Sequence, residues 1–369
     1  MEFTIHHQVL TAVFVTAVVM GAVANKTNFC TMGAVSDWVN MGDSGRLRAW
    51  LLAMAVAILG VAAMTGGGLA SIGNSTFPPY RTPNFAWLRY LLGGLMFGIG
   101  MTLASGCGNK TLVRLGGGNL KSLVVLAIAS ACAYLMLWTD FYGAVFNTWI
   151  VATTVDLGKA GMNSQALSEF FGGGTGAQAA TGGVLGLALI GFAFASKDFR
   201  GSFDNILGGL VIGLAVVVGW YITAGPMGVA WKEWAELADT LPSRVEVQSF
   251  TFISPMGDSV RYLMNPANVA NINFGVTALS GVIVGSFLYA LVSGGFRIEW
   301  FASGGDFLNH AVGAVLMGIG GVLSMGCTVG QAITGVSTLA MGSLLTFLAI
   351  VAGAAATMKI QYWRMMQEA

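Results

Sequence analysis

The sequence contains few charged residues. Asp, Glu, Lys and Arg make up 9% of its 369 residues, whereas 55% are hydrophobic, and the mean hydropathy is +0.74. In an average soluble domain about a quarter of the residues are charged. A globule of this size would have too few charges to cover its surface, so the composition indicates an integral membrane protein. The formal net charge of +1 provides no basic surface for phosphates, which argues against a nucleic-acid partner.

Several motifs of redox, metal-binding and ATP-driven proteins are also missing. None of the four cysteines, Cys30, Cys107, Cys132 and Cys327, belongs to a C-x-x-C pair, which argues against a thioredoxin-like or zinc site. No G-x-x-x-x-G-K-[ST] motif is present, so any ATP would have to be used by another protein. We expect no cofactor and no resident metal ion. The N-terminus, "MEFTIHHQVL", has no Lys or Arg before its apolar run, so we expect a retained span, not a removed signal peptide.

Nine apolar runs are long enough to cross a bilayer, which takes about 17–25 residues. They lie at approximately 8–24, 49–71, 85–106, 120–139, 179–195, 205–224, 273–293, 307–326 and 341–358. The sequence therefore predicts an all-α integral membrane protein with about nine transmembrane helices in a single membrane domain, residues 1–369. With the N-terminus outside, eleven of the 17 Lys and Arg residues fall in inner segments, so we expect an outer N-terminus and a cytoplasmic C-terminus.

Four half-apolar segments follow spans and are too short to cross the membrane. They are residues 25–43, 109–115, 225–234 and 328–337, and we expect re-entrant half-helices there. Residues 235–268, the most polar stretch, are expected to form an outer loop.

Two of these segments follow nearly the same phrase, "GIGMTLASGCGNK" at 98–110 and "GIGGVLSMGCTVG" at 318–330. Five crossings separate the copies, so they run in opposite directions, which is typical of inverted-topology repeats with a site near the midplane. We expect a first half at 1–139, a connecting segment at 140–204 and an inverted second half at 205–360. A fainter match sets Cys30 opposite Gly225.

The glycines of the repeated phrase favour two different roles. Gly94, Gly98 and Gly318 have the spacing of close helix packing in membranes. Gly106 and Gly108 flank Cys107, and Gly326 precedes Cys327 in the same way. We expect these to end a helix and to let backbone N–H groups face a ligand. Cys132, at no repeated position, is expected to be a small buried residue.

Four stretches of the chain resemble the YeeE/YedE family of bacterial inner-membrane sulfur transporters. They are Asn28-Phe29-Cys30, Gly106-Cys107 followed by Arg114, "INFGVTALSGVIVGSFL" (272–288) and "GAVLMGIGGVLSMGC" (313–327). The resemblance implies an hourglass-shaped bundle of nine spanning helices and several re-entrant helices. It implies uptake of a sulfur anion, and the best-defined members of the family take up thiosulfate. It also implies that Cys30, Cys107 and Cys327 are the three functional cysteines. Two departures, Lys110 in place of a family glycine and "KTNFC" in place of "RxRFC", mean that the resemblance alone does not assign the anion.

A protonated thiol suits such a pathway because it is inexpensive to bury and is still a weak donor. We therefore expect an anion to pass Cys30, Cys107 and Cys327 by S–H···S contacts without a covalent intermediate. Lys110 either attracts the anion or extends toward the inner interface. The remaining candidates either donate to ligand oxygens or satisfy broken backbone: Asn28, Asn109, Thr328 and Gln331.

Other functions remain open from the sequence. One is a membrane thiol oxidoreductase; another is transport of a selenium species or of a soft metal, which thiolates select. A third is a covalent persulfide relay to a cytoplasmic sulfur-carrier protein, since such carriers are often associated with the family. The lipid bilayer and a small sulfur anion are the expected partners. The resemblance implies a location in the bacterial inner membrane.

Overall fold

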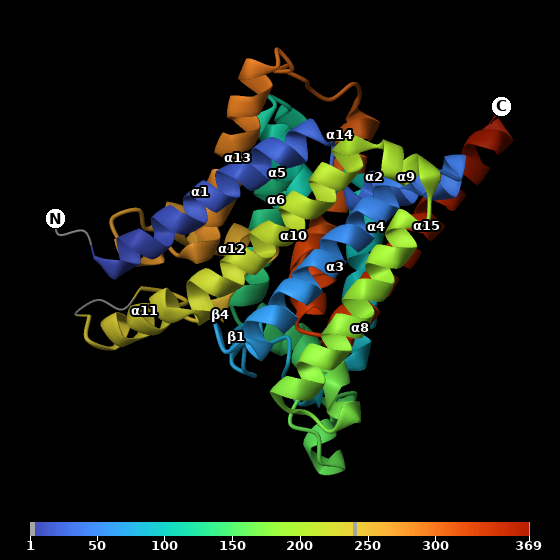
Figure 1. Cartoon of the computed structure of the whole chain (residues 1–369). Helices are drawn as coiled ribbons and strands as arrows, with labels where there is room; N and C mark the ends of the chain where they lie inside the picture. The colour runs from blue at the N-terminus through green and yellow to red at the C-terminus, as the bar shows by residue number, and fades with distance from the viewer. Residues whose placement is uncertain (1–3, 239–241, 369) are drawn as a thin grey trace.

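A computed structural model describes residues 4–238 and 242–368 and shows an all-α membrane protein (Figure 1). Within these residues nine helical segments are long and apolar enough to cross a membrane. Each overlaps one of the nine predicted runs over most of its length, so the prediction of about nine spans is confirmed. Their main helices are α1 (Ile5–Lys26), α3 (Gly45–Gly66), α4 (Trp87–Leu103), α6 (Leu120–Trp138), α8 (Gly174–Phe194), α10 (Phe203–Ala224), α13 (Phe274–Val292), α14 (Gly304–Leu323) and α15 (Met341–Glu368).

Short helices follow several of these spans. Those at the predicted half-helices are α2 (Thr31–Ser36) with the π-helix η1 (Asp37–Met41), α5 (Gly108–Gly116), α11 (Pro226–Glu236) and the π-helix η6 (Val329–Gly335). The remaining short helices are η2 (Gly143–Asn147), α7 (Thr148–Ala152), η3 (Leu157–Ala160), η4 (Leu167–Phe171), α9 (Lys197–Gly201), α12 (Ile253–Met264) and η5 (Val269–Asn271).

Four two-residue strands form two small ladders. β1 (Thr76–Phe77) pairs in parallel with β4 (Val247–Gln248), and β2 (Asn84–Phe85) pairs antiparallel with β3 (Val155–Asp156). The β1–β4 ladder joins the loop after α3 to the long segment after α11, which lie far apart in the sequence.

Two sequence expectations differ from the structure. The second span was placed at 49–71, but α3 runs from 45 to 66 because Gly68 takes a φ of 67° and ends the helical path. Residues 235–268 were expected to be an outer loop, yet they contain α12, whose first turn is buried. A polar composition misled the prediction, because the charge of Asp258 in α12 is buried and paired with Arg244.

The spanning helices pack through glycines. A Cβ atom at Gly94 of α4 would lie 2.8 Å from the Thr346 carbonyl oxygen of α15, and one at Gly318 of α14 would lie 2.7 Å from the Ala129 carbonyl oxygen of α6. A Cβ at Gly98 would overlap the Ile350 carbonyl oxygen. The packing role predicted for these glycines is confirmed, because no side chain fits where the backbones meet.

The bundle has two distinct ends. Figure 1 shows the C-terminus at one end with α2 and α9, and the β1–β4 ladder with α11 toward the other. We call these the C-terminal end and the ladder end. Between these ends, α4 packs against both α14 and α15, which brings the two copies of the repeated phrase into one core.

Candidate functional site

Three spanning helices, α1, α4 and α14, end in the same way just before a cysteine. In each, the residue two positions before the cysteine has a left-handed backbone: φ is 54° at Asn28, 56° at Ser105 and 63° at Met325. The next N–H group then bonds back five residues, from Phe29 to Ala24 (3.1 Å), from Gly106 to Met101 (2.9 Å) and from Gly326 to Gly321 (2.8 Å). This is the Schellman arrangement of a helix C-terminus.

The left-handed residue in these turns is never glycine. A non-glycine residue there costs on the order of 1–2 kcal/mol, with Asn the best tolerated. We expected Gly106 to end its helix, but the left-handed residue that ends it is Ser105, one position earlier. Such strain is maintained only where the surrounding structure fixes it, as it is at many functional sites.

Each cysteine lies at the start of the short helix that follows. Cys30 is the N-cap of α2 and Cys107 is the N-cap of α5, while Cys327 immediately precedes Thr328, the N-cap of η6. The sulfur of each lies near the backbone N–H group three residues later, and for Cys327 the Gly330 N–H donates to Sγ at 3.5 Å. All three thiols are thus buried at a helix N-terminus, with exposed fractions of 4%, 0% and 0%.

The three cysteines also lie close together. The Cys107 thiol faces the thiol of Cys30 and the hydroxyl of Thr328, the residue after Cys327. A Cβ atom at Gly108 would lie 3.7 Å from the Cys327 Cβ, an ordinary contact distance. Cys107 therefore lies between Cys30 and the Cys327 turn.

Toward the ladder end, Cys327 meets groups that sequence reasoning missed. Its thiol is near the Thr251 hydroxyl and the Phe252 backbone, and the Tyr80 phenol is close to both Cys327 and Thr251. Burial raises the pKa of Tyr80 well above its usual range, so the phenol stays protonated and can donate. Tyr80 and Thr251 belong to loops without a motif, and the β1–β4 ladder helps to bring these loops together.

Toward the C-terminal end, two cations adjoin the Cys30 and Cys107 thiols. The Lys110 ammonium donates to the Asn28 amide oxygen, which joins the turn before Cys30 to α5. Arg114, one helical turn later, donates to the Ser105 carbonyl oxygen at 2.6 Å. Both cations lie within electrostatic range of the Cys30 sulfur.

Polar groups without hydrogen-bond partners are concentrated around these turns. The affected atoms include Thr31 Oγ1, Tyr80 OH, Thr251 Oγ1, Thr328 Oγ1, Gln331 Oε1, and both Oδ1 and Nδ2 of Asn109. Each buried unsatisfied group costs about 1–3 kcal/mol. A protein retains several of them in one place when another polar species occupies the space between them, so the arrangement suits a polar ligand.

The structure answers some of the alternatives left open by the sequence. Gln331 Nε2 donates to the Ser324 carbonyl oxygen and so satisfies broken backbone, while its Oε1 is unpartnered. Asn109, two residues after Cys107, is fully buried and makes no hydrogen bond through its side chain.

A Cβ atom at Gly106, Gly108 or Gly326 would meet its nearest atoms at 3.4, 3.6 and 3.3 Å, distances that packing tolerates or nearly tolerates. Close packing therefore gives little reason for glycine at these three positions. Cys132 lies apart from the site, half-buried in α6 against Gly318.

No three His, Cys, Asp or Glu side chains within residues 4–238 and 242–368 are grouped so as to hold a metal ion. The three cysteines are thus neighbours along a line of contacts, without converging on a single point.

Comparisons with known proteins place this geometry in context. The family model described as sulphur transport matches residues 26–356. The chain is 24% identical over 329 residues to a thiosulfate transporter, TsuA, of Escherichia coli strain K12, covering 85% of this chain and 83% of that protein. It is 25% identical over 288 residues to TsuA of Spirochaeta thermophila, covering 71% of this chain and 74% of that protein.

Proposed function

The chain belongs to the sulphur transport family, and from this premise we propose that it takes up thiosulfate past the thiols of Cys327, Cys107 and Cys30. The observation that carries the proposal is the position of Cys107 between the other two cysteines, at a buried junction of three helix ends. A transported sulfur anion would meet a thiol at each stage of its passage.

The chemistry of the lining suits an anion that must both enter and leave. Thiols and hydroxyls are weak donors that stay neutral, so they hold a passing anion without trapping it. The N–H groups at the starts of α2, α5 and η6 offset its charge. The terminal sulfur of thiosulfate accepts S–H···S contacts from successive cysteines, and no covalent bond forms or breaks.

The unpartnered groups extend this lining. Tyr80 and Thr251 would receive the anion at the ladder end, Thr328 and Asn109 would donate to its oxygens near Cys107, and Lys110 would meet it beside Cys30. The glycines at 106, 108 and 326 leave the backbone open to the ligand.

We further propose the direction and location of transport. The excess of Lys and Arg in the segments assigned to the inside favours an outer N-terminus and a cytoplasmic C-terminus in the bacterial inner membrane. The ladder end then faces the periplasm, and the end with Lys110 and Arg114 faces the cytoplasm. A cytoplasmic sulfur-carrier protein is a candidate recipient at that side.

The test is uptake of 35S-thiosulfate by cells that lack their own thiosulfate transporter, with each rate divided by the amount of protein in the membrane. Because a lost thiol contact is worth about 1 kcal/mol, Cys107→Ser, Cys327→Ala and Cys30→Ala should each slow uptake at least about fivefold. Cys132→Ser is the matched control and should transport at the parental rate. Parental uptake by Cys107→Ser or Cys327→Ala would contradict the proposal.

One observation favours a second candidate, a thiol oxidoreductase, because the Cys30 and Cys107 thiols face each other and both are free. The two functions differ in what happens to these sulfurs. Thiol counts and intact mass after thiosulfate treatment should be unchanged for a permeation path. A disulfide, or an added sulfur on a cysteine, would favour redox or persulfide chemistry instead.

A further inference from the structure

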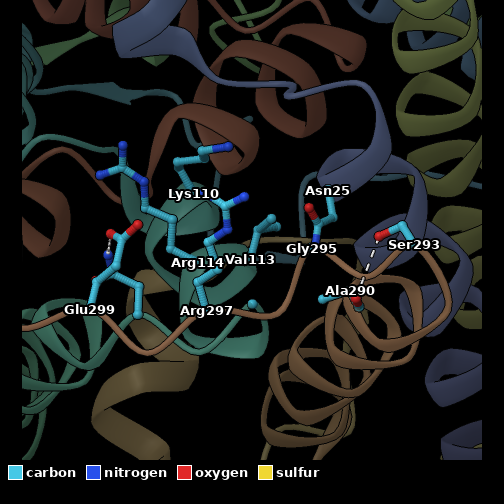
Figure 2. Close-up of a pocket in the computed structure, with 11 residues that line it drawn as sticks. Asn25, Lys110, Val113, Arg114, Ala290, Ser293, Gly295, Arg297 and Glu299 are labelled. Carbon is cyan, nitrogen blue, oxygen red and sulfur yellow. Dashed lines mark hydrogen bonds between the residues drawn. The ribbon is translucent and has the colours of Figure 1, made fainter.

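A basic cavity lies at the C-terminal end, beyond the Cys30 thiol. Its volume is about 220 Å³, and it is bounded by α5, the end of α13 and the loop that leads to α14. This is the liquid volume of about seven water molecules, enough for a small hydrated anion. Figure 2 shows Lys110 and Arg114 between Glu299 on one side and Asn25 and Ser293 on the other, with Arg297 on the adjoining loop. We call this cavity the basic vestibule.

The charges in the basic vestibule are not balanced by the protein. Lys110, Arg114 and Arg297 line it together with a single carboxylate, Glu299, which already accepts a hydrogen bond from the Asn119 amide. Among the residues that the structure describes, none of the three cations belongs to an ion pair.

Most N–H donors of these three side chains make no hydrogen bond. Lys110 donates one hydrogen bond to the Asn28 amide oxygen, and Arg114 donates one to the Ser105 carbonyl oxygen. In the described part of the chain no hydrogen bond is made by the Arg297 guanidinium, which is exposed. Three cations around one cavity repel one another, so an anion with several oxygens would relieve this repulsion.

α5 links the basic vestibule to the cysteine site. Cys107 caps this helix, and Lys110 and Arg114 follow at three and seven residues, so that their charges lie near the Cys30 sulfur and also border the cavity. A dianion leaving Cys30 would therefore enter the basic vestibule next.

We propose that the basic vestibule is a binding site for the oxygen end of a doubly charged sulfur oxyanion, with Lys110, Arg114 and Arg297 as its ligands. This inference rests on the proposed function, because it assigns the step after Cys30. Guanidinium groups present paired donors that match sulfonate oxygens, whereas the thiols suit the terminal sulfur. The two parts of the pathway thus recognise opposite ends of one ion, and the vestibule holds the ion before its release.

Arg297 offers the sharpest test because its side chain is exposed and makes no hydrogen bond or ion pair with the described part of the chain. Equilibrium binding of 35S-thiosulfate is measured on the purified full-length protein, and uptake is measured in vesicles. Arg297→Gln should weaken binding and slow uptake by on the order of tenfold, the effect of one charge-assisted contact. Arg297→Lys should restore part of the loss. Lys197→Gln removes the same charge from α9 at the same end, outside the cavity, and should leave both values unchanged.

The outcomes separate this proposal from the proposed function. If the parental protein neither binds nor transports thiosulfate, both fail. If the parental protein transports, the cysteine variants do not, and Arg297→Gln behaves as the parent, only the basic vestibule is overturned.

Vesicles of phosphatidylcholine alone and vesicles with added phosphatidylglycerol distinguish the source of the oxyanion. An equal loss of uptake by Arg297→Gln in both supports the free anion. A loss confined to the phosphatidylglycerol vesicles would mean that an anionic lipid headgroup occupies the cavity, which overturns the proposal.

Discussion

Gly108 provides a prediction that separates a pathway role from a packing role. It is the first residue of α5 and has no positive φ. A Cβ atom there would lie 3.6 Å from the Met256 Cε and 3.7 Å from the Cys327 Cβ, both ordinary contacts. Alanine therefore fits the resting structure. Because Ala exceeds Gly in helix propensity by up to about 1 kcal/mol, Gly108→Ala should leave the unfolding temperature unchanged or slightly raised.

Transport should respond in the opposite direction. The added methyl group projects into the space between the Cys107 turn and Cys327, where the anion is proposed to pass. Forcing an additional group into a filled space costs about 1–3 kcal/mol. If this cost is incurred only while the anion is passing, it raises the barrier and slows uptake about 5-fold to 150-fold.

Gly94→Ala is the matched comparison. Its Cβ would lie 2.7 Å from the Ala349 Cβ and 2.8 Å from the Thr346 carbonyl oxygen, so α4 and α15 must separate in the resting structure. This overpacking should lower the free energy of unfolding by about 1–3 kcal/mol. The uptake per folded protein should stay near the parental rate.

The assay combines thermal unfolding in detergent with 35S-thiosulfate uptake, each normalised to the amount of purified protein. A Gly108→Ala protein that unfolds at the parental temperature and also transports at the parental rate would refute the reasoning. The space between Cys107 and Cys327 would then lie off the pathway.

Two further predictions concern buried polar groups near the ladder end. Tyr80→Phe removes a buried hydroxyl without a hydrogen-bond partner, so stability should rise by about 1 kcal/mol while uptake falls. Tyr90→Phe, whose hydroxyl accepts from Gln165 at 2.9 Å, should instead lower stability by about 1 kcal/mol and leave uptake per folded protein unchanged. Reduced stability with normal uptake for Tyr80→Phe would contradict this. Asp258→Ala leaves Arg244, which contacts it at 2.7 and 3.0 Å, without its partner, and should lower the free energy of unfolding by about 3–5 kcal/mol in denaturant titrations. An unchanged midpoint would show that the pair is dispensable.

The spans and the cysteine turns could be predicted because each is encoded locally. Length and hydropathy determine a span, and the repeated phrase marks the ends of α4 and α14. Tyr80 and Thr251 could not be predicted, because each lies in an irregular loop and these loops meet through tertiary contacts such as the two-residue β1–β4 ladder. Arg297 could not be predicted as a site residue either, since its place at a cavity depends on how the loop after α13 returns to α5.

The choice of the left-handed residue was also beyond sequence reasoning. Glycine is the usual residue for the left-handed conformation at a helix end, so we expected the helix to end at Gly106. The conformation falls instead on Ser105, and on Met325 in the equivalent turn. Tertiary packing compensates for the strain at these positions, and no local pattern reports that compensation.

The packing of the helices favours the prediction of two inverted halves, because a contact between two helices has a counterpart between the corresponding helices when the two halves are exchanged. α1 packs against α13 as α10 packs against α3, and α4 packs against α15 as α14 packs against α6. The short helices follow the same exchange, since α5 contacts α13 and α6 while η6 contacts α3 and α15.

The same exchange identifies a break in the symmetry at Cys30. α2 contacts α3, α4 and α15, and the helix with the corresponding contacts to α13, α14 and α6 is α12, not α11. The N-cap of α12 is Phe252, so the packing favours Phe252, rather than Gly225, as the counterpart of Cys30. At this position one half therefore has a thiol close to Lys110 and Arg114, whereas the other has Phe252, whose backbone lies near Cys327. Two equivalent halves would present the same groups at both ends, whereas this difference concentrates the positive charge near Cys30 at the C-terminal end, as the proposed basic vestibule requires.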